Sequence, residues 1–360
     1  MDFHLDEDLV AVRDLAREIF TDQATPDRAR EVEGSDTRVD ARLWGDLARA
    51  GLLGIALPEE HDGAGLGMPG LAVLLIEQGR RVAPVPLWSA GVAALVVASH
   101  GDDDERTRLL PGLASGATRL TLALEEYAAD PARPGCVARP AGDGWTLTGT
   151  KAVVPTPVGA DGVLVSASTP DGTGLFLVEA GATWETAAVT THDLAGELRL
   201  DGSPAERVGG PGTLADVLAT AAVAVAAVQL GVARGALDLA AAYVSEREQF
   251  GRPLGTFQAL QHQLADCWID CESMEVTLWQ AVVDAAEPGL SALVAKWWCD
   301  QAGLDVVHRV QHVHGGIGVD VDYPVHRYFL WGKQLSSTLG GAAAALADLG
   351  DRLAVTEVHT

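Results

Sequence analysis

The stretch SEREQFGRPLGTFQALQHQLAD, residues 245–266, is the most informative segment of this chain. Arg247 and Phe250 follow the end of an apolar helical run, and a Gly-Arg-Pro turn comes next. Gln258 and Gln261 then open a second helix. The pattern places a guanidinium, an aromatic ring and two amides near one turn, a combination that suits a pyrophosphate and an adenine. The alternative interpretation is a salt bridge between Arg247 and an acid that caps the helix.

The segments around this turn have helical periodicity. LATAAVAVAAVQLGVARGALDLAAAYV, residues 218–244, is apolar nearly all round, so it must be covered on every side, in a bundle or at a subunit interface. The run from Val217 to Val228 is rich in Ala and is bracketed by Asp216 and Gln229, which favours a buried bundle helix over a membrane span. Further helical segments lie near residues 257–286, 290–312 and 335–354.

The hydrophobic periodicity divides the chain into three zones. Residues 1–117 carry apolar residues at helical spacing and form a predicted N-terminal helical domain. Residues 118–210 hold short β-rich runs such as GWTLTGTKAVV and GVLVSAS and form a predicted antiparallel sheet or barrel. Residues 211–360 form a predicted C-terminal four-helix bundle. The fold class is therefore α+β, and the lack of βαβ alternation argues against a Rossmann fold.

Composition and charge exclude several classes of protein. The formal net charge of −25 argues against nucleic-acid binding, which needs clustered Lys and Arg. The start MDFHLDEDLVAVRDLAREIF reads as an amphipathic helix and not as an export signal. Four scattered cysteines, at positions 136, 267, 271 and 299, show no CxxC pair and are predicted to be buried thiols. We expect a cytoplasmic protein that binds neither nucleic acid nor membrane.

A second informative block, HVHGGIGVDVDYPVHRYF, covers residues 312–329. The adjacent Gly315 and Gly316 let the backbone come close to a ligand, and free amides there can accept phosphate oxygens. His308, His312 and His314 have the spacing of a helix face, but no acidic partner completes a zinc site. Cofactor or helix-end hydrogen bonding is the favoured role for these imidazoles.

The two blocks resemble motifs of the acyl-CoA dehydrogenase family. Residues 245–266 are similar to the signature of that family, and HGGIG is similar to its glycine turn. The loop PEEHDGAGLG, residues 58–67, resembles the motif of its first domain, and GWTLTGTK, residues 144–151, resembles a strand pair of its middle domain. The motifs follow one another in the order and at the spacing of the family, so the resemblance covers essentially the whole chain.

The resemblance implies a fold, a cofactor and a set of contacts. It implies dimers or tetramers in which FAD lies between subunits, with Arg247, Phe250 and Gln258 binding the ADP half. Gly315 and Gly316 add the glycine turn. His312 stands where the family places a Gln, and Gln311 lies beside it.

The resemblance breaks at the catalytic base. The family reaction removes an α-proton from an acyl thioester, so it needs a positioned carboxylate. Leu339 occupies the usual base position, and the alternative position used by some members falls at about Ala221. The loop that touches the flavin ring is shortened to LEEYAADPA, and AVVPTPVGAD follows Lys151 in place of aromatic and hydroxyl contacts. The sequence thus predicts a retained ADP-binding side and an eroded ring-binding side.

This asymmetry predicts one subunit of a heteromer. The chain resembles the non-catalytic subunits of actinobacterial acyl-CoA dehydrogenases of steroid side-chain degradation, which share an acyl-CoA substrate, an FAD and an electron-transfer acceptor with a partner subunit. Two alternatives remain at this stage. The first is an active, self-associated enzyme with a relocated base such as Glu125 or Glu126. The second is a flavin-free acyl-CoA-binding or scaffold protein.

Overall fold

The structure is a computed structural model that describes residues 3–357 except residues 129, 180–182 and 285. Its contacts divide the chain into two compact units. Unit 1 comprises residues 1–26, 72–83 and 222–360, and unit 2 comprises residues 27–71 and 84–221. The α+β class predicted from periodicity is confirmed. The domain boundaries near residues 117 and 210 stay predictions, although helix gives way to strand after Ser115.

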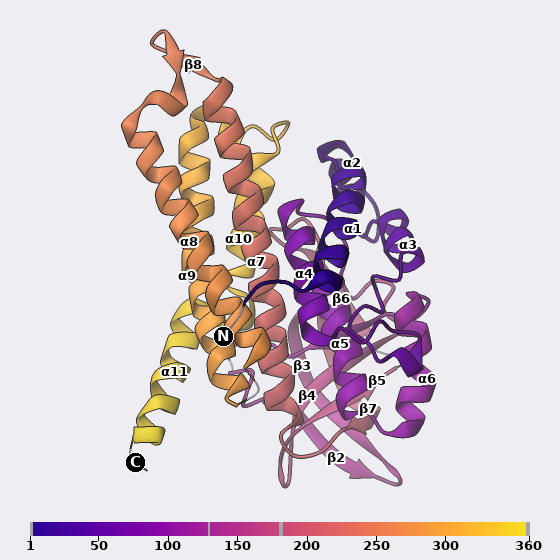
Figure 1. Cartoon of the computed structure of the whole chain (residues 1–360). Helices are drawn as coiled ribbons and strands as arrows, with labels where there is room; N and C mark the ends of the chain where they lie inside the picture. The colour runs from indigo at the N-terminus through magenta and orange to yellow at the C-terminus, as the bar shows by residue number, and fades with distance from the viewer. Residues whose placement is uncertain (1–2, 129, 180–182, 285, 358–360) are drawn as a thin grey trace. The chain divides into compact units, whose positions relative to one another are not determined.

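Unit 1 is helical. It contains α1 (Glu7–Gln23), the C-terminal part of α4 (Gly67–Arg80) and most of α7 (Thr213–Glu246), and then α8, α9, α10 and α11 (Figure 1). These last four run over Gln258–Val283, Pro288–His314, Val325–Leu335 and Gly341–Glu357, and the short strands β8 (Glu248–Gln249) and β9 (Arg252–Pro253) precede them. In the described residues the C-terminal segment holds four helices of at least 17 residues, as predicted, together with the unpredicted α10.

Glycines let α4 and α7 pack with their backbones in contact. A Cβ on Gly231 would overlap the carbonyl oxygen of Ile76, and a Cβ on Gly79 would overlap that of Val228. A side chain at Gly235 would meet the carbonyl of Arg80. Because no residue larger than glycine fits at these positions, the crossing fixes one register between the two helices.

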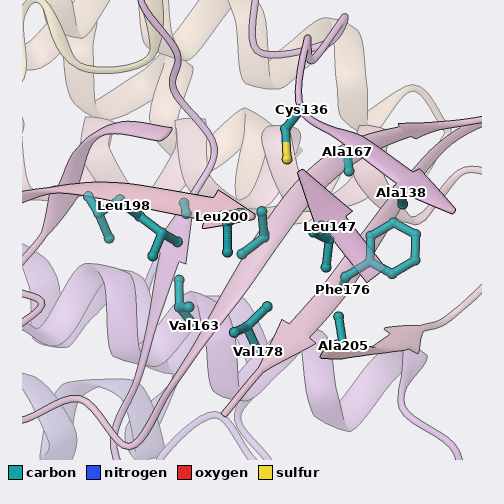
Figure 2. Close-up of a cluster of buried hydrophobic side chains, with 13 residues drawn as sticks. Cys136, Ala138, Leu147, Val163, Ala167, Phe176, Val178, Leu198, Leu200 and Ala205 are labelled. Atoms are coloured by element: carbon teal, nitrogen blue, oxygen red, sulfur yellow. The ribbon is translucent and has the colours of Figure 1, made fainter. Parts of the chain in front are cut away.

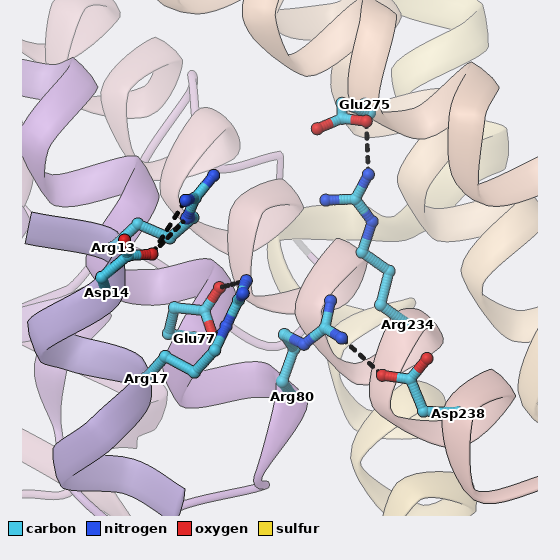
Figure 3. Close-up of polar contacts among 8 residues, drawn as sticks. All are labelled: Arg13, Asp14, Arg17, Glu77, Arg80, Arg234, Asp238 and Glu275. Atoms are coloured by element: carbon cyan, nitrogen blue, oxygen red, sulfur yellow. Dashed lines mark hydrogen bonds and ion pairs between the residues drawn. The ribbon is translucent and has the colours of Figure 1, made fainter. Parts of the chain in front are cut away.

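Ion pairs join α4 and α7 to each other and to the neighbouring helices α1 and α8. Figure 3 shows three pairs that join an arginine on one helix to a carboxylate on another, together with the Arg13–Asp14 pair within α1. The three pairs between helices are Arg17–Glu77 between α1 and α4, Arg80–Asp238 between α4 and α7, and Arg234–Glu275 between α7 and α8. Only Glu77 among these side chains is nearly fully buried, so the other two pairs contribute little stability and chiefly select the pairing.

The predicted buried bundle helix is confirmed. Among the described helices only α7 is long and apolar enough to cross a membrane, yet 72% of its most apolar window is buried inside the protein, as in a core helix. Ala221 through Ala233 are buried without interruption. The four cysteines are free and buried, also as predicted. Burial raises the pKa of Cys267 to about 11 and that of Cys271 to about 12, so both remain protonated thiols.

Unit 2 combines short helices with a small barrel. The helices are α2 (Pro26–Glu33), α3 (Ala41–Arg49), α5 (Leu87–His100) and α6 (Asp103–Ser115). The strands are β1 (Leu120–Ala123), β2 (Val137–Ala141), β3 (Gly144–Pro155), β4 (Gly162–Thr169), β5 (Gly172–Val178), β6 (Thr183–Ala188) and β7 (Leu194–Val208). Pairings run from β4 through β2, β3, β7 and β5 back to β4, so the sheet closes on itself.

The barrel interior explains its sequence pattern. Alternate residues of β4, from Val163 to Ala167, point into a core that also contains Leu147, Phe176 and Leu198 (Figure 2). The other face of β4 is buried too, which explains its unbroken apolar run. The predicted antiparallel pairing holds for most of the sheet, but β1 pairs with β4 in parallel and β2 meets β4 in parallel at one position.

Candidate functional site

The hairpin after α7 exposes a strained aromatic side chain. Gln249 pairs with Arg252, so Phe250 and Gly251 form a two-residue turn. Both have positive φ, 56° and 77°, which is the geometry of a type I′ turn. A bulky residue is disfavoured in that conformation. Phe250 nevertheless occupies it with 91% of its surface exposed. Strain combined with an exposed ring is typical of a residue kept for a ligand or partner.

Arg247 lies at the base of this hairpin. Its backbone N–H donates to the carbonyl of Tyr243 at 2.9 Å, and its carbonyl accepts from the N–H of Leu254 at 2.8 Å. The side chain is exposed, and in the part of the chain that the structure describes its guanidinium forms no ion pair or hydrogen bond. The alternative of a helix-capping salt bridge therefore finds no support among these residues, and the positive charge is available to a ligand.

The start of α8 separates the two predicted amides. Gln258 is exposed, whereas the Gln261 side chain donates to the carbonyl of Gly255 at 2.9 Å and so holds the turn. Phe257, directly before α8, packs edge-on against Phe250 with ring centroids 6.1 Å apart. Only Gln258 thus offers a free position for a ligand contact.

Arg252 was not predicted from the sequence as part of this cluster. Its guanidinium carbon lies 4.1 Å from the centroid of the Phe257 ring, a cation–π contact that fixes the second cation of the hairpin. The sequence showed that Arg252 lies in a Gly-Arg-Pro turn, but it did not show that its guanidinium would lie over the ring of Phe257.

The glycine turn follows the end of α9. Gly315 has φ 60°, which requires glycine, and Gly315 and Gly316 are both exposed with open space where a Cβ would stand. His312 is exposed. Gln311 donates from its side chain to the carbonyl of Gly318, so this amide stabilises the turn and does not replace His312 as a ligand group.

Aromatic stacking connects the glycine turn to the hairpin. The His314 ring stacks on Tyr243, with centroids 4.6 Å apart and an interplanar angle of 23°, and Tyr323 packs against both. The Nδ1 atom of His314 lies 2.8 Å from the carbonyl of Val310. Burial lowers the pKa of His314, and the bond to Val310 opposes this only in part, so the imidazole is neutral at pH 7.

These contacts place all six predicted cofactor residues at one end of unit 1, which we call the hairpin end. Arg247 is hydrogen-bonded to Tyr243, Tyr243 stacks on His314, and Gly315 comes next. The structure does not support a zinc site: His308 packs on Phe329, and the described residues contain no group of three or more possible ligands. Tyr243 was missed in the sequence because its partner lies 71 residues away.

The predicted base positions hold no ionisable group. Leu339 lies in a kink between α10 and α11 where Leu339, Gly340 and Gly341 have φ values of 58°, 95° and 72°. Leu339 is half-buried. Ala221, the alternative position, is completely buried within α7. The kink thus has an unusual backbone shape and carries an alkyl side chain at its first residue.

Glu126, one proposed substitute base, is used inside unit 2. Its carboxylate lies 2.5 Å from the ammonium of buried Lys151 and accepts the N–H groups of Gly135 and Cys136 at 2.8 and 3.0 Å. Lys151 also donates to Ser166 at 2.9 Å. Burial tends to raise the pKa of Glu126, but the Lys151 ammonium and the two amides bring it below its ordinary value. The carboxylate is a structural anion and a poor proton acceptor.

A bulge in β3 follows Lys151. The register between β3 and β7 shifts between Lys151 and Val154, and in this bulge Val153 has φ 44° with 44% of its surface exposed. Glu125, the other suggested base, is half-buried, and its carbonyl accepts the N–H of Ala152. The exposed position of the bulge therefore carries an alkyl group, and the loss of flavin-ring contacts stays a prediction.

The α+β architecture, the barrel and the glycine turn at the hairpin end define a flavoprotein dehydrogenase fold, and the chain belongs to the acyl-CoA dehydrogenase family. The C-terminal domain of acyl-CoA dehydrogenases matches residues 210–353, and the N-terminal domain matches residues 6–117. The family comprises oxidoreductases that act on CH–CH bonds.

Among individual proteins, the acyl-CoA dehydrogenase FadE27 of Mycobacterium tuberculosis is 37% identical over 99% of this chain and 100% of its own length. One solved structure, the Tcur3481–Tcur3483 steroid ACAD G363A variant, shares 60% identity with a TM-score of 0.96, covering 98% of this chain and 99% of that one. The ChsE4–ChsE5 complex from M. tuberculosis shares 36% identity with a TM-score of 0.94 and the same coverage. The predicted family, its steroid-type relatives and its flavin cofactor agree with these findings.

Proposed function

We propose that this chain is the non-catalytic subunit of a heteromeric acyl-CoA dehydrogenase and supplies the ADP-side contacts for an FAD shared with a catalytic partner. The observation that carries the proposal is a contrast within unit 1. The hairpin end exposes Arg247, strained Phe250 and Gln258, whereas Leu339 occupies the position of the base.

The residues at the hairpin end fit the ADP half of FAD. The Arg247 guanidinium offers a charge-assisted contact to a pyrophosphate, and the exposed Phe250 ring offers a face or edge to an adenine. Gln258 and His312 offer hydrogen bonds, and the turn at Gly315 and Gly316 leaves room for close approach of the backbone. FAD, when bound, accepts the hydrogen that leaves the β-carbon of the acyl group as a hydride.

The role of this chain in the reaction is then to bind and to orient. Removal of the α-proton needs a carboxylate within hydrogen-bond reach, and neither Leu339 nor Ala221 has a proton-accepting atom. Glu126 is bound to Lys151. On this proposal the α-proton moves to a carboxylate of the partner subunit, which also supplies the flavin-ring contacts.

The similarity to relatives described as a steroid ACAD and as a two-subunit complex supports both the heteromer and the substrate class. A steroid-derived acyl-CoA is the first substrate to test, and an electron-transfer acceptor would reoxidise the flavin. The cytoplasmic location stays a prediction.

The test is co-expression of this chain with a candidate catalytic subunit of the acyl-CoA dehydrogenase family. We expect the purified pair to carry FAD and to lose its 450-nm absorbance on addition of a steroid acyl-CoA, while this chain alone does neither. Stoichiometric FAD together with turnover in the isolated chain would refute the division of roles.

A further inference from the structure

The β8–β9 hairpin carries a second arginine besides Arg247. Arg252 is exposed, and its guanidinium carbon lies 4.1 Å from the centroid of the Phe257 ring. A guanidinium that lies over an aromatic ring keeps the N–H groups at its edge free for an anion. Among the residues that the structure describes, no carboxylate pairs with Arg252. The charge of this second arginine is therefore also available to a ligand.

The pairing of the two strands brings the arginines to one face of the hairpin. Gln249 is paired with Arg252, and paired residues of an antiparallel ladder share a face. Arg247 precedes Gln249 by two residues, so by the alternation of a strand it falls on the same face. Its carbonyl accepts the N–H of Leu254 at 2.8 Å, which extends the ladder by one position. The arginines are thus diagonal neighbours, a relation that separates Cα atoms by about 7–8 Å and is within reach of long side chains.

The carboxylates next to Arg247 do not neutralise these two cations. Glu248 is paired with Pro253, one position away from Gln249, so it falls on the other face of the hairpin. Glu246, the last residue of α7, is exposed and forms no ion pair with either arginine in the described part of the chain. Because the whole chain has a net charge of −25, an anionic ligand depends on local cations of this kind.

Two guanidiniums on one face suit two adjacent phosphates. Each guanidinium presents parallel N–H donors that match two oxygens of one phosphate group. A pyrophosphate carries negative charge on both of its phosphates, so it can engage both cations at once. A monophosphate has less charge and fewer oxygens, so it gains less from the second cation.

The aromatic pair of the hairpin holds the second cation in place. The Phe257 ring lies under the guanidinium of Arg252 and packs edge-on against Phe250, with ring centroids 6.1 Å apart. A side chain that is already fixed by stacking loses less conformational freedom when it binds a ligand. One continuous stack therefore connects the ring proposed to contact the adenine with the second cation.

We propose that Arg252 is a second phosphate-binding residue of the nucleotide site. Together with Arg247 it selects ligands with two adjacent phosphates, such as ADP and the ADP half of FAD, over nucleotides with one phosphate. The inference rests on the proposed ADP site and adds the residue that sets its phosphate specificity. Phe257 acts through Arg252 and is a positioning residue.

Competition between nucleotides tests this specificity. In the co-expressed pair, stripped of flavin, ADP and AMP each compete with FAD for binding. Arg252→Ala should weaken ADP binding about tenfold and AMP binding less than about threefold, because only ADP engages both cations. The matched control Arg139→Ala removes the same charge from an exposed position of β2, and we expect it to change both affinities less than about twofold. Equal losses for ADP and AMP, or no loss for ADP, would overturn the proposal.

Two further substitutions separate binding from folding. Arg252→Lys keeps the charge but loses the planar fork, so the preference for ADP over AMP should shrink while ADP binding falls less than in Arg252→Ala. Phe257→Leu leaves the cation but removes the ring beneath it, and it should weaken ADP binding about threefold. If Arg252→Ala lowers the unfolding temperature and the affinities for ADP and AMP together, the arginine only stabilises the hairpin and the proposal is wrong.

The outcomes also distinguish this inference from the proposed function. A pair in which Arg247→Ala weakens FAD retention but Arg252→Ala does not contradicts the second phosphate contact alone. A wild-type pair that binds no ADP contradicts the ADP role of the hairpin end, and with it the proposed function.

Discussion

The hairpin end of unit 1 and the kink at Leu339 both have strained backbones, but they present opposite chemistry. At the hairpin, Phe250 adopts a left-handed conformation to expose an aromatic ring beside the free guanidinium of Arg247. At the kink, Leu339 adopts a similar conformation and presents only methyl groups. Backbone strain occurs at both places, but the side chains differ: the first offers an exposed ring and a cation, and the second offers no proton-accepting atom.

The comparison holds only if no other carboxylate acts as the base, and Glu126 is the candidate to exclude. Glu126→Gln removes the partner of a fully buried ammonium, and breaking such a pair costs about 3–5 kcal/mol of unfolding free energy. We expect a large fall in the urea midpoint of the isolated chain. The control is Glu185→Gln, at an exposed pair with Arg199. This substitution should change the unfolding free energy by less than about 0.5 kcal/mol. A stable variant pair that has lost only flavin bleaching would instead identify Glu126 as the base.

The same ion pair predicts a pH dependence. Because the folded-state pKa of Glu126 lies below its ordinary value, its contribution to stability is complete above the unfolded-state pKa. That contribution is lost as the pH falls through the folded-state pKa. Wild-type unfolding free energy should therefore decrease more steeply than that of Glu126→Gln between about pH 5 and pH 3. Parallel curves for the two proteins would contradict the assignment.

At the hairpin, Arg247→Ala tests the binding role directly. Loss of one charge-assisted contact should weaken FAD retention in the pair by about 1–3 kcal/mol, measured as the dissociation constant for added FAD. The matched control is Arg133→Ala, which removes the same charge from an exposed position in unit 2. If both variants retain FAD equally, the hairpin is not the binding site.

Phe250→Gly separates ligand binding from stability at one residue. Glycine adopts φ 56° without strain, so removal of the ring should leave the unfolding free energy unchanged or raise it by about 1 kcal/mol. FAD retention should fall in the same variant, because the exposed ring is lost. A variant that is destabilised yet keeps its flavin would mean that the ring serves packing.

Leu339→Gln should have the smallest effect. The substitution is isosteric enough for a half-buried site and introduces no base, so turnover by the pair should stay within about twofold of the wild type. A loss of several orders of magnitude would show that the kink of this chain contributes to catalysis and would erase the contrast with the hairpin.

The sequence was sufficient for the order of the elements and the class of the fold. Helical and alternating periods are local properties, so the long helices and strands such as β3 and β4 were predicted within a few residues. Among the elements of the described residues, α10, β2 and β6 were missed, as were the two-residue strands β8 and β9. Helix α10 has only 11 residues, β2 contains Pro140, and β6 is largely exposed, so each is short or lacks a buried face.

The candidate site could be predicted as a set of residues but not as an arrangement. The stack of Tyr243 on His314, the cation–π contact of Arg252 and the left-handed turn at Phe250 depend on contacts between distant segments. The prediction that this chain lacks a base rests on residue identity alone, at Leu339 and Ala221. The type of a residue can be read from the sequence, whereas the mutual orientation of side chains from distant segments cannot.

The close packing of α4 against α7 joins residues near 79 and residues near 231, some 150 positions apart in the sequence, in one compact unit. Gly79 on α4 contacts Gly231 on α7. A fragment that starts at residue 210 would contain α7 but lack the segment of α4 that packs against it. Such a fragment should be insoluble or only loosely ordered when expressed alone, even though it spans a complete domain by sequence similarity. Truncation experiments on this protein must therefore carry residues 72–83 along with the C-terminal helices.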